Sequence, residues 1–246
     1  LALSHRGWKA LKKIGLDKPV EKISIPMTGR MIHDLEGNTQ LIPYGKEGQA
    51  INSVSRGGLN IVLMNEAEKA GATIHFNERC TNIDLETNTL HFENTITGER
   101  TVVKSGLVIS SDGAYSAGRL GMMQTDRYNY AQQYIDHGYK ELTIPPGESG
   151  SFRMEKHALH IWPRGGYMLI ALPNPDGSFT CTLFFPFAGS PSFAELDTPE
   201  KVKQFFLEVF PDACELIPGL EHEFMRNPTG SLVTVKAFPW TYKNQL

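Results

Sequence analysis

The sequence predicts a mixed α/β fold in two parts, a layered α/β region followed by a mostly antiparallel β-sheet. Three observations support this prediction. Strand patterns flank an amphipathic helical stripe between residues 51 and 76. An apolar run at 107–111 ends abruptly in Asp112-Gly113. Beyond residue 138, longer strand patterns alternate with turns rich in proline and glycine.

The N-terminal elements are joined by strong turn signals. A helix is expected over residues 4–14, because apolar residues recur there at near-helical spacing. Strands are expected at 29–34 and 39–44, on either side of a Glu-Gly-Asn cluster that favours a turn. Such a hairpin would bring Arg30 and Tyr44 together.

Residues 51–76 follow a strand, helix and strand pattern. A strand is expected at 51–55, a helix ending at Gly71, and a second strand at 73–76. This alternation indicates an α/β layer with a parallel component. An antiparallel meander should follow, with strands at 79–85, 89–93 and 100–103.

The run at 107–111 is the most informative local feature. A buried strand is expected there, Gly113 allows a sharp turn, and Ser116 suits the N-cap of a following helix. Amide groups exposed at such a corner can face a phosphate-bearing cofactor. An ordinary strand-turn-helix corner has the same pattern, so this motif alone leaves both interpretations open.

The second part of the chain predicts a sheet covered by a helix. Its strands are expected at 138–144, 158–162, 167–172 and 178–185. A helix over 198–210 carries an apolar face, and a strand at 232–238 would return towards the first part. The predicted domains are therefore 1–122 and 123–235, with residues 236–246 beginning the return.

Composition narrows the class of protein. The chain has 246 residues, 40% of them hydrophobic, and a formal charge of −3. No dense basic stripe suggests nucleic-acid binding, and no apolar run approaches the roughly 20 residues of a membrane span. A globular protein that binds no nucleic acid is expected. The 246 residues give no indication of membrane attachment.

Cysteine and histidine spacing argues against a metal centre. Cys80, Cys181 and Cys214 lie far apart and match no zinc or dithiol pattern, which favours a reducing, cytoplasmic compartment. His157 and His160 would face opposite sides of a strand. We therefore expect no metal site.

Motifs in order along the whole chain resemble the class A FAD-dependent aromatic-ring hydroxylases, and among these the kynurenine 3-monooxygenase family. The corner at 107–119 resembles their second flavin fingerprint. The family's G-x-G-x-x-G loop and later Gly-Asp motif are not in this sequence, so the chain resembles the middle portion of such an enzyme. The other matching motifs are Leu1-Ala2-Leu3-Ser4-His5-Arg6-Gly7, Arg30-Met31-Ile32-His33, Ile42-Pro43-Tyr44-Gly45, Ser53-Val54-Ser55-Arg56, His137-Gly138-Tyr139-Lys140-Glu141-Leu142, Leu159-His160-Ile161-Trp162-Pro163 and Asn227-Pro228-Thr229-Gly230.

The resemblance implies an oxidoreductase with a partial flavin-binding Rossmann-like layer and a substrate-binding sheet. It implies FAD as bound cofactor, NADPH as co-substrate, and 3-hydroxylation of L-kynurenine with O2 during tryptophan degradation. A flavin C4a-hydroperoxide would carry the chemistry, so no catalytic side chain is expected. The resemblance also allows a homodimer, and some relatives carry a membrane anchor near their C-terminus.

Site residues follow from the same resemblance. Arg30 and Tyr44 would hold the substrate carboxylate, a role that suits a planar guanidinium and a hydroxyl donor. The ring pocket would be lined by Ile51, Leu159, Met168, Ile170 and Phe184. Cofactor contacts would come from Ala2, Arg56, Cys80, Asp112 and Gly113. Without the resemblance, Arg30 reads as a surface strand residue and the pocket residues as ordinary core.

Two alternatives remain at this stage. The chain could belong to a related flavin hydroxylase that acts on another aromatic acid. It could also be a flavin-free module that keeps the carboxylate-binding residues, since two cofactor motifs of the family are not in the sequence.

Overall fold

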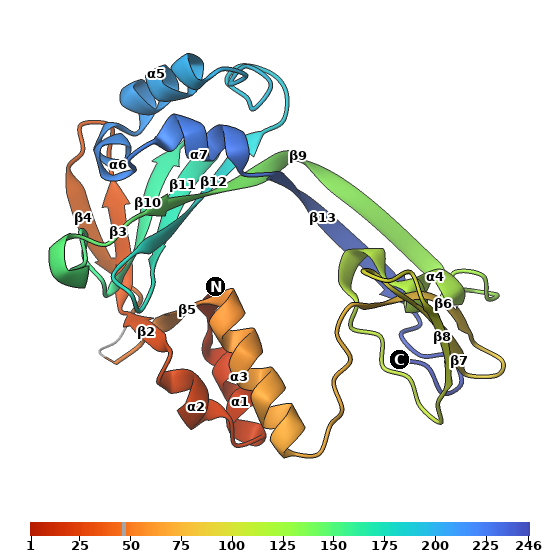
Figure 1. Cartoon of the computed structure of the whole chain (residues 1–246). Coiled ribbons are helices and arrows are strands. Elements are labelled where there is room, and N and C mark those ends of the chain that lie inside the picture. The colour runs from red at the N-terminus through yellow and green to blue at the C-terminus, as the bar shows by residue number, and fades with distance from the viewer. Residues whose placement is uncertain (46–47) are drawn as a thin grey trace. The chain divides into compact units, whose positions relative to one another are not determined.

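The computed structural model describes residues 1–45 and 48–246 (Figure 1). These residues form two compact units, one of residues 1–72 and 136–231 and the other of residues 73–135 and 232–246. The predicted boundary at residue 122 lies inside the second unit. The mixed α/β fold class is confirmed, whereas the assignment of cofactor and substrate roles to the two parts stays a prediction.

Most of a seven-stranded sheet lies in the first unit, with strand order β13-β9-β12-β11-β10-β3-β4, and parts of β9 and β13 belong to the second unit. Its strands are β3 (Gly29–His33), β4 (Thr39–Pro43), β9 (Asn129–Ile144), β10 (Ala158–Arg164), β11 (Tyr167–Pro173), β12 (Phe179–Pro186) and β13 (Thr229–Phe238). β3 and β10 run parallel, whereas β3–β4, β10–β11, β11–β12 and β12–β9 are antiparallel. The predicted hairpin and mostly antiparallel sheet are confirmed.

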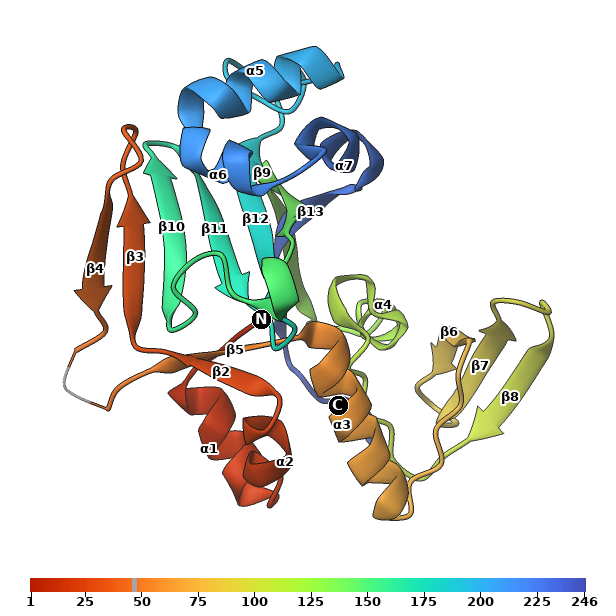
Figure 2. The ribbon, with the colours of Figure 1, turned by 60° about the vertical axis from the view of Figure 1, so that its left-hand side comes forward.

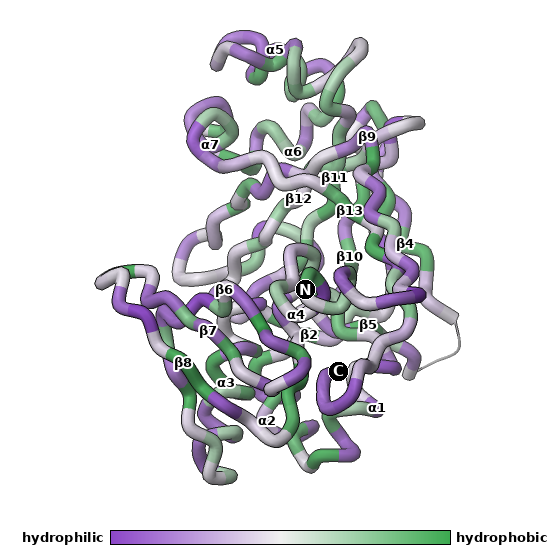
Figure 3. The backbone as a smooth tube through the Cα atoms, turned by 90° about the vertical axis from the view of Figure 1, so that its right-hand side faces the viewer, coloured by the Kyte–Doolittle hydropathy of each residue, from purple (hydrophilic) through white to green (hydrophobic). Residues whose placement is uncertain are grey.

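Three helices lie together against one face of this sheet: α5 (Pro199–Val209), α6 (Pro211–Leu216) and α7 (Leu220–Arg226) (Figure 2). Alternate strand residues, including Trp162, Leu169 and Leu183, form one core cluster with helix residues such as Phe206 and Phe224. In Figure 3, β11 is largely green, whereas α7 alternates between green and purple. The burial of apolar side chains on this face holds the helical layer to the sheet.

The predicted covering helix is α5. It begins after Thr198, whose Oγ1 accepts a hydrogen bond from Lys201 N at 3.3 Å, and Pro199 occupies its first turn. α6 and α7 are absent from the sequence prediction. Each is too short to show a clear apolar period.

A three-stranded sheet in the order β1-β5-β2 completes the first unit with helices α1 (His5–Lys13), α2 (Asp17–Glu21) and α3 (Arg56–Lys69). Its strands are β1 (Ala2–Leu3), β2 (Ser24–Met27) and β5 (Ile51–Val54), and a 3₁₀ turn, η2, spans Glu148–Gly150. The predicted helices at the N-terminus and before Gly71 are confirmed. β5 pairs antiparallel with both neighbours, so the parallel strand-helix-strand unit expected here is wrong.

The second unit contains the antiparallel meander β6 (Glu78–Asp84), β7 (Thr89–Asn94) and β8 (Arg100–Lys104), as predicted. It also contains a 3₁₀ turn, η1 (Gly113–Tyr115), and α4 (Ala117–Met122). Within the described part of the chain, residues 73–76 form no strand, and Phe76 is 62% exposed. They have no neighbouring strand there to supply hydrogen bonds.

The buried strand expected at 107–111 is also wrong for the described residues. Only Val108 forms a β-bridge, a parallel one with Gln245, and it alone of its apolar neighbours is buried. Leu107 and Ile109 are 63% and 64% exposed. An apolar run forms a buried strand only where strands flank it and another layer covers it.

Candidate functional site

The face of the seven-stranded sheet opposite the helices carries most of the predicted substrate residues. Register pairs place Arg30 beside Leu159, Met168 beside Phe184, and Ile161 beside Ile170. Neighbours in register point to the same face of a sheet, and so do residues two apart in one strand. Arg30, Leu159, Met168, Ile170 and Phe184 therefore share one face, which we call the open face.

The open face is apolar and partly exposed. Met168 is 41% exposed, and Leu159, Ile170 and Phe184 are half-buried. Arg30 stands at the end of this apolar surface, on β3. Ile51 lies apart from this set, because it belongs to β5 and pairs with Met27 in the other sheet. The structure therefore brings the predicted pocket residues together on one face, except Ile51.

The β3–β4 hairpin joins Arg30 to Tyr44. The guanidinium carbon of Arg30 lies 4.8 Å from the centroid of the Tyr44 ring, a cation–π distance. Tyr44 N donates to Thr28 O at 3.0 Å, which fixes the residue immediately after β4. Gly29 is required in this hairpin, because a Cβ there would come within 2.7 Å of Ile42 O.

The Tyr44 hydroxyl is buried and donates its proton to no acceptor among residues 1–45 and 48–246. Burial raises the pKa of Tyr44, whereas the positive charge of Arg30 and a hydrogen bond from its guanidinium oppose this effect. The neutral Tyr44 hydroxyl and the exposed Arg30 guanidinium are both hydrogen-bond donors. They lie side by side without a shared acceptor among the described residues. A carboxylate fits it, since it accepts from both groups.

The first unit also contains Ala2 and Arg56. Ala2 pairs with Ser53, and Arg56 opens α3 just after the same strand. Ser55 Oγ caps the helix by accepting from Gly58 N at 3.3 Å. The first turn of α3 has no acidic residue, and a Cβ at position 57 would meet no atom closer than 4.0 Å. An exposed arginine at an open helix N-terminus fits an anionic part of a cofactor such as FAD.

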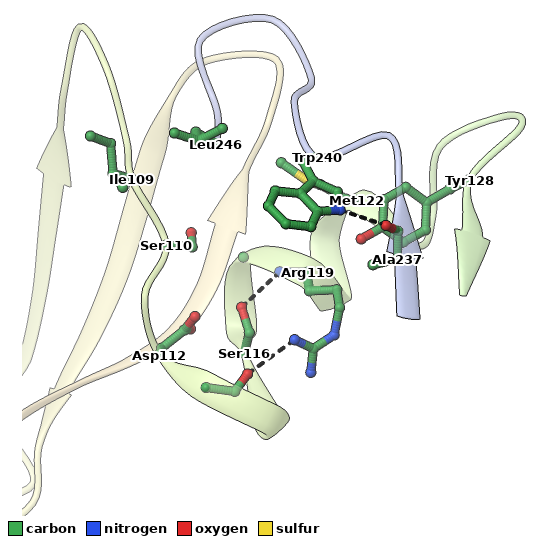
Figure 4. A pocket seen from close by; sticks show the side chains of 12 residues that line it. Ile109, Ser110, Asp112, Ser116, Arg119, Met122, Tyr128, Ala237, Trp240 and Leu246 are labelled. Carbon is green, nitrogen blue, oxygen red and sulfur yellow. Dashed lines mark hydrogen bonds between the residues drawn. The ribbon is translucent and has the colours of Figure 1, made fainter. Parts of the chain in front are cut away.

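The second unit contains the other predicted cofactor residues. Cys80 and Asp112 line one hollow of about 310 Å³. Asp112 and Gly113 line a second hollow of about 380 Å³ together with Ser116, Arg119 and Trp240 (Figure 4). Gly113 has a φ of +80°, a conformation that glycine adopts without strain. The sharp turn expected at this corner is confirmed.

Asp112 and Ser116 hold the start of α4. Asp112 Oδ2 accepts from Ala117 N at 2.7 Å, and Ser116 Oγ accepts from Arg119 N at 3.0 Å, as the predicted N-cap requires. Burial favours a higher pKa for Asp112, but hydrogen bonds from Ser116, Ala117 and Gly118 outweigh it and lower the pKa. Hydrogen bonds within the strand-turn-helix corner therefore occupy the Asp112 carboxylate. The backbone of Gly113 is left to face the hollow.

Arg119 is directed at this corner too. Its guanidinium donates to Gly113 O at 3.0 Å and to Ala114 O, and it lies 5.4 Å from the Tyr130 ring centroid. Gly118, one position before Arg119, packs tightly against Ser110. A Cβ at position 118 would lie 2.1 Å from Ser110 Oγ, so only glycine allows α4 to pack this closely.

Burial raises the pKa of the Cys80 thiol, and the nearby Asp112 carboxylate adds to this effect. Its Sγ contacts Asn82 O at 3.7 Å across a β-bulge. The thiol is thus kept neutral, which leaves a backbone contact as the predicted role of Cys80. The two cofactor sets lie in different units, and their assembly into one flavin site stays a prediction.

Two features are absent from the part of the chain that the structure describes. No group of histidine, cysteine and acidic side chains there could hold a metal ion. No helix of the described residues is long and apolar enough to cross a membrane.

Sequence reasoning missed a buried network of His33, His160, Trp162 and Asp212. The partners lie up to 179 positions apart, so no local signal pointed to it.

The chain resembles named proteins over its whole length, although no family model matches it. It is 47% identical over 246 residues to the kynurenine 3-monooxygenase of Flavobacterium psychrophilum, covering all of this chain and 55% of that protein. It is 50% identical over 242 residues to that of Myxococcus xanthus, covering 98% and 52%. The Dictyostelium discoideum enzyme is 47% identical and is covered to 53%.

Solved structures agree with the fold. The tetrameric form of 2-methyl-3-hydroxypyridine-5-carboxylic acid oxygenase matches all of this chain and 62% of its own, with a TM-score of 0.76 and 18% identity. A tetracycline destructase matches with a TM-score of 0.60 and 17% identity. The chain spans about half the length of the curated relatives it matches. The predicted resemblance to kynurenine 3-monooxygenases is confirmed, over part of their length.

Proposed function

We propose that this chain, which resembles the middle portion of kynurenine 3-monooxygenases, supplies the substrate-binding surface of an FAD- and NADPH-dependent 3-hydroxylase of L-kynurenine. The observation that carries this proposal is the open face. It combines a cationic and a hydroxyl donor at one end with a continuous apolar surface beside them. Kynurenine has the matching chemistry, a charged amino-acid group joined to an aromatic ring.

Arg30 and Tyr44 would bind the substrate carboxylate. The guanidinium can donate two parallel hydrogen bonds, and the buried Tyr44 hydroxyl would gain the acceptor that it lacks among the described residues. Because burial raises the pKa of Tyr44, its hydroxyl keeps its proton and stays a donor. The carboxylate would thus fix one end of the substrate.

The apolar residues of the open face would orient the ring. Leu159, Ile170 and Phe184 are half-buried and carry no polar side-chain group, so they can pack against an aromatic face and exclude water. Ile51 is proposed to complete this pocket from the neighbouring sheet. Together they would hold ring position 3 in one orientation relative to the anchored carboxylate.

When bound, FAD would supply the activation of oxygen, with NADPH as the reductant. Arg56, at the open N-terminus of α3, would contact an anionic part of the cofactor. Ala2, Cys80, Asp112 and Gly113 would add mainly backbone contacts. None of these side chains is proposed to move a proton to or from the substrate.

The experiment is incubation of the full-length protein with FAD, NADPH, oxygen and kynurenine, followed by mass spectrometry. The proposal expects a product one oxygen atom heavier that forms only when kynurenine and NADPH are present. Binding of flavin without this product would redirect the proposal to another aromatic acid. A full-length protein that binds no flavin would favour the flavin-free carboxylate-binding module instead.

A further inference from the structure

A chain of hydrogen bonds runs behind the β3 strand, on its helix-covered side. His33 Nδ1 lies 2.6 Å from Asp212 Oδ2, and His33 Nε2 lies 2.9 Å from His160 Nδ1. His160 Nε2 lies 2.8 Å from the carbonyl oxygen of Glu155. Trp162 Nε1 donates to both carboxylate oxygens of Asp212 at 2.9 Å. His33 and His160 are only 4% and 2% exposed.

Each bond in this chain requires one proton. The Glu155 carbonyl can only accept, so His160 Nε2 must carry a hydrogen. The Asp212 carboxylate is also an acceptor when ionised, so His33 Nδ1 must carry another. The bond between the two rings needs a third. Two neutral imidazoles have only two N–H groups between them, so the chain is complete only when the pair carries one additional proton and a net positive charge.

The additional proton belongs to His33. Burial lowers the pKa of His160 to about 4, so that ring stays neutral and accepts through Nδ1. Burial favours a higher pKa for Asp212, but the hydrogen bonds from His33 and Trp162 outweigh it and keep the pKa low. Asp212 therefore supplies the compensating negative charge, and the His33 ring stacks on Trp162 with centroids 3.9 Å apart.

The remaining charged groups around His33 come from β10, from the loop before it and from the turn between β3 and β4. Arg164 donates from Nη1 to His33 O at 3.1 Å and from Nη2 to Asp34 O at 3.0 Å. Its charge is balanced by Asp212, Asp34 and Glu36. The Glu155 carboxylate instead accepts from His157 N at 2.8 Å. Asp212 is the only one of these anions that accepts a hydrogen bond from the His33 ring among the described residues.

β3 carries both His33 and, three positions earlier and on the open face, Arg30. β3 lies between β10 and β4, and β4 is an edge strand that is exposed along its whole length. His33 is the one buried side chain of β3 that reaches a helix by a hydrogen bond, since Asp212 lies in α6. The His33–Asp212 pair thus connects β3, the strand that carries Arg30, to the helical layer.

We propose that His33 is a positioning residue for Arg30, acting as a buried imidazolium paired with Asp212 that fixes β3 against α6. This inference rests on the proposed function and adds to it a protonation requirement. Without the additional proton, one of the three bonds cannot form. The strand then loosens and kynurenine binds less tightly, although neither histidine touches the substrate.

The Asp212→Asn variant distinguishes a requirement for the additional proton from a purely structural role of the contact between His33 and Asp212. The amide oxygen can accept from Trp162 Nε1, while the amide NH₂ can donate to His33 Nδ1. His33 then donates from Nε2 to His160, and the whole chain is satisfied by two neutral rings. The variant therefore keeps the geometry and removes the need for the additional proton. Asp197→Asn is the matched control, because it removes one exposed carboxylate, paired with Lys201, from the same helical region.

The test measures kynurenine dissociation constants by calorimetry for the full-length, FAD-loaded protein and both variants, from about pH 6 to about pH 9. Wild type and Asp197→Asn should lose about fivefold more affinity over this range than Asp212→Asn does. Ionisation of kynurenine itself cancels in this comparison. Identical pH profiles for all three proteins would overturn the proposal.

Nitrogen NMR of the wild-type histidine rings gives a second result that needs no variant. Two protonated nitrogens on His33 at the lower pH, with a neutral His160, are expected. A neutral His33 there would overturn the protonation requirement. Failure of wild-type protein to bind kynurenine at any pH would instead refute the proposed function, and the NMR spectrum would still decide the charge of His33.

Discussion

Tyr44→Phe should weaken substrate binding while stabilising the free protein. The Tyr44 hydroxyl is buried and donates to no acceptor among the described residues, and leaving a buried donor unsatisfied costs about 1–3 kcal/mol. Removing it should raise the free energy of unfolding by about 1 kcal/mol. In the complex, the same hydroxyl would donate to a carboxylate, a hydrogen bond of about 1.5 kcal/mol, so the kynurenine dissociation constant should rise about tenfold.

The assay pairs urea unfolding of the ligand-free, full-length protein with calorimetric titration of kynurenine. Tyr242→Phe is the control, because its hydroxyl already donates to Glu86 Oε1 at 3.1 Å. That control should lose stability, by up to about 1 kcal/mol, and keep its kynurenine affinity. If Tyr44→Phe loses stability and binds kynurenine as wild type does, the hydroxyl has an internal partner and no role in the site.

Three further predictions concern other parts of the chain. Gly118→Ala should lower the free energy of unfolding by about 1–3 kcal/mol in urea titrations, because its Cβ would lie 2.1 Å from Ser110 Oγ; unchanged stability would contradict the tight packing. The pKa of Asp112 is lowered in the folded state, so its stabilising contribution is present above the usual carboxylate range. That contribution should disappear as pH falls through the lowered pKa, and an Asp112→Asn variant should show a smaller loss of melting temperature in acid. Burial raises the pKa of Cys181 far above its usual range, so iodoacetamide should label the half-buried Cys214 before Cys181, as peptide mass spectrometry would reveal; early labelling of Cys181 would contradict its burial.

Local patterns predicted the elements whose signals are complete in the sequence. The β3–β4 hairpin and α5 belong to this group, because turn chemistry, capping residues and apolar period all agree there. The Asp112–Gly113 corner was predicted for the same reason. Such elements form from contacts between residues that are close in the chain.

The wrong predictions concern elements that depend on distant partners. The run at 107–111 is apolar enough for a buried strand, yet its environment in the described chain provides a single bridge. The pairing of His33 with Asp212 is equally invisible, because it joins residues that are 179 positions apart. The open face was predictable in part, since alternation places Met168 and Ile170 together but cannot supply the register that adds Arg30.

The most direct test of the central claim is a crystal structure of the full-length protein with kynurenine bound. In that crystal structure, the substrate carboxylate should lie within hydrogen-bond distance of Arg30 and of the Tyr44 hydroxyl, with the aromatic ring against Leu159, Ile170 and Phe184. A kynurenine molecule bound with its carboxylate away from Arg30, or its ring away from the open face, would contradict the proposed binding mode.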